Sequence, residues 1–180
     1  MSLFKKFIIV FAVIVFFLFI ALLIALWYLG AFASVNVVSE ERGPYYIVTL
    51  AHEGPYQRIM YKIEQVDTML KEKGIVGLNA VGLYDDNPAA VPPDQLRSRG
   101  GFIVHDSVKV DSPFILQKIE LRTVAIATIK AHPAVAPFKT YPALYEWINN
   151  KGYEVITEQP VLELYHDEDL VEVEMPIIAK

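Results

Sequence analysis

The chain has 180 residues and no cysteine, so it contains neither disulfide bonds nor thiolate metal sites. Its formal net charge is -5, and the part after residue 33 is more acidic still because Lys5 and Lys6 precede it. This charge, without a basic stripe or a helix-turn-helix pattern, argues against nucleic acid as a partner. The four histidines have no paired ligand spacing, so we expect no metal site and no cofactor.

An uncharged segment of 27 residues runs from Phe7 to Ala33. About 20 apolar residues are enough to span a bilayer, so this segment predicts a transmembrane anchor within residues 1–33 that contacts lipid over residues 7–33. Trp27 and Tyr28, near its end, are residue types that favour the membrane interface. A buried core helix is a poor alternative for an uncharged segment of this length.

A cleaved signal peptide is the competing interpretation, because Ala31-Phe32-Ala33 has the small-x-small form of a cleavage site. The apolar region of a signal peptide is only about 7–15 residues long, which favours an uncleaved, single-pass anchor. Lys5 and Lys6 precede the segment and acidic residues follow it. The positive-inside rule therefore predicts a cytoplasmic N-terminus and a domain on the outer side, periplasmic or extracellular.

After a predicted linker at residues 34–44, the first half of the domain has the order strand, helix, strand, strand. β-Branched and aromatic residues predict the strands, and apolar residues at a spacing of about 3.6 predict the helix, which Gly74 ends. The predicted ranges are 45–51 (strand), 56–73 (helix), 78–84 (strand) and 101–104 (strand).

The second half follows a linker at about 105–117 and repeats this order. Its helix ends at Gly152, and its last two strands form a hairpin around an acidic turn. The predicted ranges are 121–129 (strand), 142–151 (helix), 162–165 (strand) and 171–175 (strand).

The two halves align as an internal repeat, at about residues 45–104 and 120–177. Lys73-Gly74-Ile75 matches Lys151-Gly152-Tyr153, and Leu83-Tyr84 matches Leu164-Tyr165. We therefore predict an α+β fold: an N-terminal transmembrane helix, then a pseudo-symmetric, duplicated β-α-β-β domain over residues 45–180. Its helices lie on one side of the sheet, and a groove lies between the halves.

The predicted strand at 161–165 carries one carboxylate, Glu163, between apolar neighbours. Alternation puts Leu162 and Leu164 on one face, which we expect the helices to cover, and Glu163 on the other face with Tyr165. The repeat alignment sets Gly82 opposite Glu163 and Tyr84 beside it. A solvated glutamate is the simple alternative, but a carboxylate in a groove attracts organic cations, and aromatic rings add cation–π contacts.

Several of these motifs resemble the gyrase-inhibitor-like (GyrI-like) effector-binding domain family, which includes the drug-sensing domains of multidrug-responsive transcription activators. The matching motifs are Gly54-Pro55-Tyr56 after the first strand, Trp147 on the second helix and Glu163-Leu164-Tyr165. The resemblance implies that Glu163 lies in the groove and meets cationic, aromatic ligands, and that Trp147 borders it. Some relatives are hydrolases of cyclopropane-bearing compounds that use an acid and an aromatic hydroxyl.

The chain also resembles the vertebrate testis-expressed reticulophagy receptors of the endoplasmic reticulum. It does so in its N-terminal span, in the segment 84–88 and in Val91-Pro92-Pro93-Asp94. Those receptors carry a long acidic tail with an autophagy-protein-binding motif, whereas this sequence ends at Lys180. The resemblance therefore implies a membrane-tethered GyrI-like domain without the autophagy function.

We predict a binding module for a small hydrophobic or cationic ligand. One alternative is a hydrolase with Glu163 as general base, and the other is a membrane-anchored scaffold for a protein partner, which does not need Glu163. The sequence offers no clear second acid–base group, so it favours binding over catalysis. The residues expected to contact the ligand are Glu163, Tyr165, Tyr84, Gly82, Trp147 and Tyr56.

Overall fold

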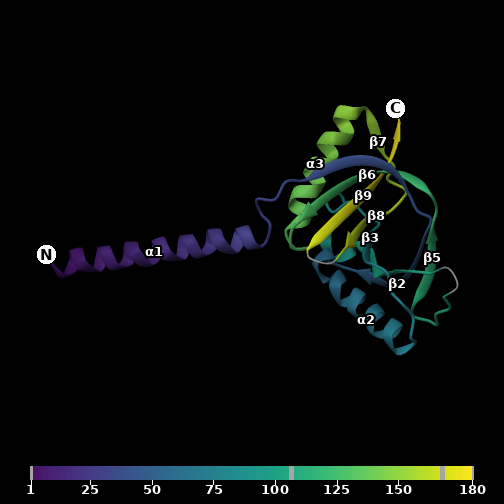
Figure 1. Cartoon of the computed structure of the whole chain (residues 1–180), viewed down its shortest axis with the longest axis horizontal. Coiled ribbons are helices and arrows are strands. Elements are labelled where there is room, and N and C mark those ends of the chain that lie inside the picture. Colours follow the sequence, from purple (N-terminus) through teal and green to yellow (C-terminus); the bar gives the residue numbers. More distant parts are fainter. Residues whose placement is uncertain (1, 106–107, 167–168, 180) are drawn as a thin grey trace.

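A computed structural model describes residues 2–105, 108–166 and 169–179. Helix α1 (Leu3–Tyr28) projects from the rest of the chain as a separate rod (Figure 1), and none of its residues is buried. By length and composition alone, α1 is able to cross a membrane. An α+β domain with a large antiparallel sheet follows it, which confirms the predicted fold class.

The domain contains two α-helices and, among the described residues, nine strands in one antiparallel sheet. The helices are α2 (Ile59–Glu72), which the 3-10 turn Tyr56–Arg58 precedes, and α3 (Ala136–Lys151). The strands are β1 (Asn36–Arg42), β2 (Tyr45–Glu53), β3 (Ala80–Tyr84), β4 (Arg97–Val104), β5 (Ile115–Ile119), β6 (Arg122–Lys130), β7 (Tyr153–Val155), β8 (Val161–Tyr165) and β9 (Leu170–Ala179). Their order in the sheet is β1-β6-β9-β8-β3-β4-β2-β5, and β7 adds to the end of β9.

Both helices of the domain cover the same face of the sheet. Residues paired across antiparallel strands share a face, and the register places Val48 of β2 on the face of Tyr165 in β8 and Val171 in β9. Val48 packs in the α2 cluster, and Val171 packs in the α3 cluster. Each helix buries one apolar stripe, as the spacing of the α2 residues predicts.

The opposite face closes on itself because the sheet is curled. The Tyr45 hydroxyl of β2 donates a hydrogen bond to Glu174 Oε1 of β9 at 2.8 Å, although β8, β3 and β4 lie between these strands. In a flat sheet, strands four positions apart would be separated by about 19 Å. The curled sheet therefore encloses an apolar cluster without a helix: Ile47, Val81, Leu83, Ile103, Leu162 and Leu164.

The expected facing of β8 is therefore wrong. Leu162 and Leu164 lie on the inner, curled face, whereas Glu163 lies on the face that the helices cover. The alternation of side chains along β8 correctly predicted which residues share a face. The curl of the sheet makes its inner face apolar as well, and the sequence pattern does not distinguish this face from the one that the helices cover.

Two of the expected linkers contain strands. The range 34–44 contains β1, whose seven residues pair with β6, and the range 105–117 includes the start of β5, which pairs with β2. Both strands lie at the ends of the strand order, where one side of a strand is unpaired. The polar sequence of β1 suits such an edge, which is why its composition resembled that of a linker.

Helix α3 begins six residues earlier than the range 142–151 predicts. Its first turn contains Pro137. A proline there costs no backbone hydrogen bond, because the first amide groups of a helix have no partner within the helix. Pro142 lies inside the helix instead of opening it. The predicted ends are confirmed: Gly74 and Gly152 follow α2 and α3 in the left-handed conformation, with φ of +64° and +72°.

The hydrogen bond that closes the curl should contribute measurably to stability. Tyr45→Phe removes the donor and leaves a buried oxygen of Glu174 without it, so we expect the free energy of unfolding to fall by about 1–3 kcal/mol. Denaturant unfolding of the full chain in non-ionic micelles measures this. Tyr46→Phe is the control, since no hydrogen bond of the Tyr46 hydroxyl is found in the described part of the chain; equal losses in the two variants would contradict the closure.

Candidate functional site

Glu163 is a buried carboxylate at the centre of the sheet. It lies in the middle of β8, and its side chain is only 4% exposed. The register places it directly across from Gly82 of β3 on one side and Val173 of β9 on the other. Helix α3 covers it from above, through Tyr141.

Tyrosine hydroxyls surround this carboxylate. Tyr141 donates a hydrogen bond to Glu163 Oε1 at 2.9 Å, and Tyr165 donates one to Oε2 at 2.9 Å. The hydroxyls of Tyr84 and Tyr165 are 3.0 Å apart. Because the Tyr165 hydroxyl already donates its hydrogen bond to Glu163, the Tyr84 hydroxyl is the donor in its pair with Tyr165. We call Tyr84, Tyr141 and Tyr165 the tyrosine cage.

The negative charge of Glu163 has no cationic partner in the described part of the chain. Burial raises the pKa of its carboxyl, and the hydrogen bonds from Tyr165, Tyr141 and Tyr84 oppose this shift. Burial, followed by the neighbouring carboxylate, raises the pKa of each of the three hydroxyls well above 10. The site is therefore an ionisable group in an apolar setting, compensated by hydroxyl dipoles alone.

Gly82 lies under the ring of Tyr84. A Cβ atom at Gly82 would lie 3.0 Å from Tyr84 Cε2 and from its hydroxyl oxygen, so the absent side chain gives the ring its place. Tyr84 in turn meets the ring of Tyr56 edge-on, with centroids 4.8 Å apart. The space that we expected beside Gly82 is thus filled by Tyr84 in this structure.

Tyr56 forms a second layer behind the cage and does not reach Glu163 itself. Its hydroxyl donates to the carbonyl of Asp86 at 2.7 Å. Asp86 is also bound by the guanidinium of Arg97, at 2.6 Å from Nη2 to Oδ1. The pair that closes the loop at residues 85–97 is therefore Asp86 and Arg97.

Trp147 lies away from the cage. Its ring stacks on Tyr153, with centroids 5.8 Å apart and planes within 5°. Trp147 and Tyr141 are six residues apart on α3, which places them about 120° apart around the helix. The structure therefore brings together Glu163, Tyr165, Tyr84 and Gly82, with Tyr56 behind them, whereas the ring of Trp147 stacks on Tyr153.

Tyr141 was not among the predicted site residues. The predicted helix began at Pro142, so Tyr141 fell outside the element that carries it. A signal was present, since Tyr141 lies three residues before the buried Leu144, close to the apolar stripe of α3.

Glu174 is a second buried carboxylate, on the inner face. It is fully buried. Tyr45 donates to one oxygen, and Arg122 Nη2 lies 3.9 Å from the other. Burial raises the pKa of this carboxyl also, and Tyr45 and Arg122 oppose the shift. Unlike Glu163, Glu174 has a cationic neighbour.

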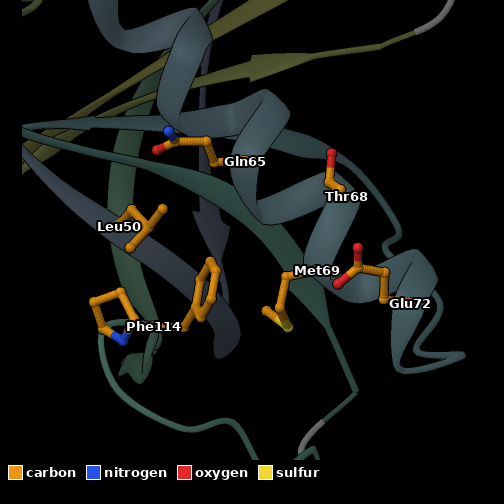
Figure 2. A pocket seen from close by; sticks show the side chains of 7 residues that line it. Leu50, Gln65, Thr68, Met69, Glu72 and Phe114 are labelled. Atoms are coloured by element: carbon orange, nitrogen blue, oxygen red, sulfur yellow. The ribbon is translucent and has the colours of Figure 1, made fainter.

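Two surface pockets lie elsewhere on the domain, and Glu163 and the cage line neither of them. One, of about 470 Å³, lies between α2 and the segment before β5 (Figure 2), where Met69 and Phe114 face each other. The other, of about 560 Å³, is formed by residues 108–111 and 114–116. Because Glu163 is buried under the tyrosine cage in this conformation, a ligand needs one of the rings to move.

A sequence profile of the GyrI-like small molecule binding domain matches residues 36–177. The chain belongs to the GyrI-like family. The matched region begins at the first residue of β1 and ends within β9, so the family domain comprises the whole sheet and both of its helices.

Solved structures of the same fold include three that cover most of this chain. The C-terminal domain of EcmrR aligns with a TM-score of 0.68 and 17% identity, over 81% of this chain and 99% of that one. A hydrolase from Listeria innocua aligns with a TM-score of 0.55 and 13% identity, over 79% and 92%. SAV2435 bound to tetraphenylphosphonium aligns with a TM-score of 0.52 and 10% identity, over 79% and 94%. At these identities the likeness is one of fold.

No curated protein matches the chain. The resemblance to the reticulophagy receptors is therefore unsupported, and the family assignment rests on the GyrI-like profile.

The raised pKa of the Glu163 carboxyl predicts a pH dependence of stability. A folded-state pKa above the usual 4.5 means that folding takes up a proton. The resulting stability is complete below pH 4.5 and is lost as the pH rises through the folded-state pKa. Glu163→Gln removes this titration, so its free energy of unfolding should fall less than that of the unsubstituted chain between pH 4.5 and neutral pH. Unfolding of the full chain in micelles at several pH values measures the difference.

Glu146→Gln is the matched control for this comparison, because Glu146 is an exposed carboxylate on α3. Its pH profile should follow that of the unsubstituted chain. The same profile for Glu163→Gln would contradict a raised pKa at Glu163.

Proposed function

We propose that the chain is a membrane-tethered receptor for lipophilic cations, which bind against Glu163. The observation that carries this proposal is the buried carboxylate of Glu163, whose partners among the described residues are hydroxyls and not a cation. A buried charge without a counter-ion is costly, and a bound cation removes that cost. The cage also supplies aromatic faces, which attract cations.

A relative of the same fold supports the choice of ligand. SAV2435 was solved bound to tetraphenylphosphonium, a cation whose charge is enclosed by aromatic rings. Such a ligand matches the chemistry here, a single carboxylate among tyrosines. A neutral compound would gain the ring contacts without compensating the charge.

The proposed entrance is a groove between two halves of a duplicated domain. The strand orders β3-β4-β2 and β8-β9-β6 follow the same path outward from the middle of the sheet, and each half packs its own helix. Glu163 and Gly82 face each other where the halves meet. Rotation of the Tyr84 ring away from Gly82 would open space at this junction.

The proposed tether is α1, with the N-terminus in the cytoplasm and the domain on the outer side. The segment after α1 supports an uncleaved anchor, since it packs against the domain. Lys139 Nζ donates hydrogen bonds to the carbonyls of Ala31 and Ala33, and Ala33 contacts the α3 cluster. Cleavage at Ala33 would remove an integral contact of α3.

Hydrolysis is the second candidate, because Glu163 lies within 2.9 Å of two aromatic hydroxyls and one relative of the fold is a hydrolase. A carboxyl with a raised pKa suits a general base. The hydroxyls, however, have pKa values well above 10, which makes them poor proton donors at neutral pH. This contrast favours binding. A pure protein scaffold gives no reason for burying Glu163.

Removal of the charge should weaken cation binding selectively. Glu163→Gln keeps the size of the side chain, so we expect the Kd for tetraphenylphosphonium to rise by roughly 5- to 150-fold, the equivalent of losing one charged hydrogen-bond partner. Triphenylphosphine oxide, a neutral compound with similar rings, should bind both proteins alike. Equilibrium dialysis of the full chain in non-ionic micelles measures both affinities.

Glu146→Gln again controls for a general loss of negative charge and should bind the cation as the unsubstituted chain does. Equal affinities of Glu163→Gln and the unsubstituted chain, or no binding by either, would reject Glu163 as the counter-ion of the ligand.

The tether has its own test. The full-length chain should stay in the membrane fraction after alkaline carbonate washing, and mass spectrometry of that fraction should find residues 1–33 still attached. A mature chain that begins at Ser34 would replace the anchor with a signal peptide.

A further inference from the structure

The segment between α1 and the domain is pinned to the loop between β6 and α3. The carbonyl of Leu29 accepts a hydrogen bond from the amide of His132 at 3.1 Å. Gly30 has a φ of +77°, and a Cβ atom there would lie 2.6 Å from the Cα atom of Ala131, so only glycine fits this approach. Lys139 holds the next carbonyls, of Ala31 and Ala33. The domain therefore contacts the chain directly after the end of α1, with no free linker between them.

This attachment fixes how near the domain lies to a membrane that α1 spans. The uncharged part of α1, residues 7–28, is about 33 Å long at 1.5 Å per residue, close to the 30 Å of a bilayer hydrocarbon core. The headgroup layer adds about 5–8 Å on each side. Residues 29–33 follow directly, so they and the β6–α3 loop that holds them fall at headgroup depth.

The side chains at this depth are apolar except for His132, and none of them is an acid. The segment from Ala131 to Phe138 has no Asp, Glu, Lys or Arg, and basic residues, Lys130 and Lys139, flank it. Phe138 is 81% exposed, and Phe32 is 64% exposed. Figure 1 shows the connection from α1 entering the domain beside α3. Exposed aromatic rings beside a spanning helix are typical of the membrane interface.

We propose that Phe32, Pro133, Ala134, Val135 and Phe138 form a membrane-contact surface, seated in the lipid headgroup layer of the membrane that α1 spans. The proposal rests on the tether proposed above and adds a second attachment, through the domain. The occupant is lipid because the surface is continuous with the proposed span. Lys139 donates a hydrogen bond to the carbonyl of Ala31 just after α1, and Phe138 precedes Lys139 in the chain. Contact with lipid removes these exposed rings from water.

The contact surface lies close to the tyrosine cage. Phe138 precedes Tyr141 by three residues, about 4.5 Å along α3. Ala131, at the end of β6, lies four residues beyond Ala127, which is level with Glu163 in the sheet, and this separation is about 13 Å. A ligand dissolved in the headgroup layer would therefore begin within a short distance of Glu163.

Depth-dependent fluorescence quenching tests the contact. The chain has no cysteine, so single variants carry one label each: Phe138→Cys and Ala134→Cys in the surface, and Leu18→Cys within α1. Each full-length variant, labelled with a nitrobenzoxadiazole dye, is placed in phosphatidylcholine vesicles that contain a lipid with a spin label near the headgroup or deep in the acyl chain. We expect the headgroup-proximal quencher to act several-fold more strongly than the deep one on labels at 138 and 134, and the deep quencher to dominate at 18.

Tyr61→Cys is the matched control, because Tyr61 is an aromatic residue of α2 that is 68% exposed and lies outside the surface. It should show little quenching by either lipid. Labels at 138 and 134 that behave like the label at 61, while position 18 is quenched, would overturn the contact surface and leave the anchor intact. Failure of quenching at position 18 as well would refute the anchor, and the contact surface with it.

Discussion

The hydrogen bond between Tyr45 and Glu174 marks the constraint on which the rest of the domain depends, the curl of its sheet. Strands that would be about 19 Å apart in a flat sheet touch through these two side chains. The inner face then fills with its own apolar side chains and has no room for a helix. Both helices are left to the outer face, one over each end of the strand order, and the paired middle strands β3 and β8 lie between them.

Each face of the sheet carries a buried glutamate, and the two carboxylates have different partners. On the inner face, Glu174 meets a hydroxyl and a guanidinium, and together these groups tie β9 to β2 and to the start of β6. On the outer face, the partners of Glu163 among the described residues are hydroxyls. A buried carboxylate with a cationic neighbour has its charge balanced within the fold, whereas one without such a neighbour is available to an external cation. This difference separates a structural acid from a candidate ligand site.

Local signals in the sequence predicted most helices and strands. Features that depend on the curling of the sheet could not be predicted from such signals. Glycines 74 and 152 marked the helix ends because their backbone conformation requires glycine there. The facing of Glu163 could not be predicted, because alternation does not say which face the helices cover. Tyr141 was missed because Pro142 was taken as the first residue of a helix, whereas α3 begins six residues earlier, at Ala136. The closure through Tyr45 depends on a contact between residues 129 positions apart, which no local pattern contains.

The close attachment at Gly30 limits how copies of the chain can assemble. In the proposed membrane tether, with the domain held to the end of α1 by these contacts, every copy presents the same end to the membrane and differs from its neighbours only by rotation about the membrane normal. Closed assemblies of such copies are then cyclic, with their axis perpendicular to the bilayer, and dihedral assemblies, which require inverted copies, are excluded within one membrane. In the proposed tether, the contact of Gly30 with Ala131 therefore restricts the point-group symmetry of an assembly.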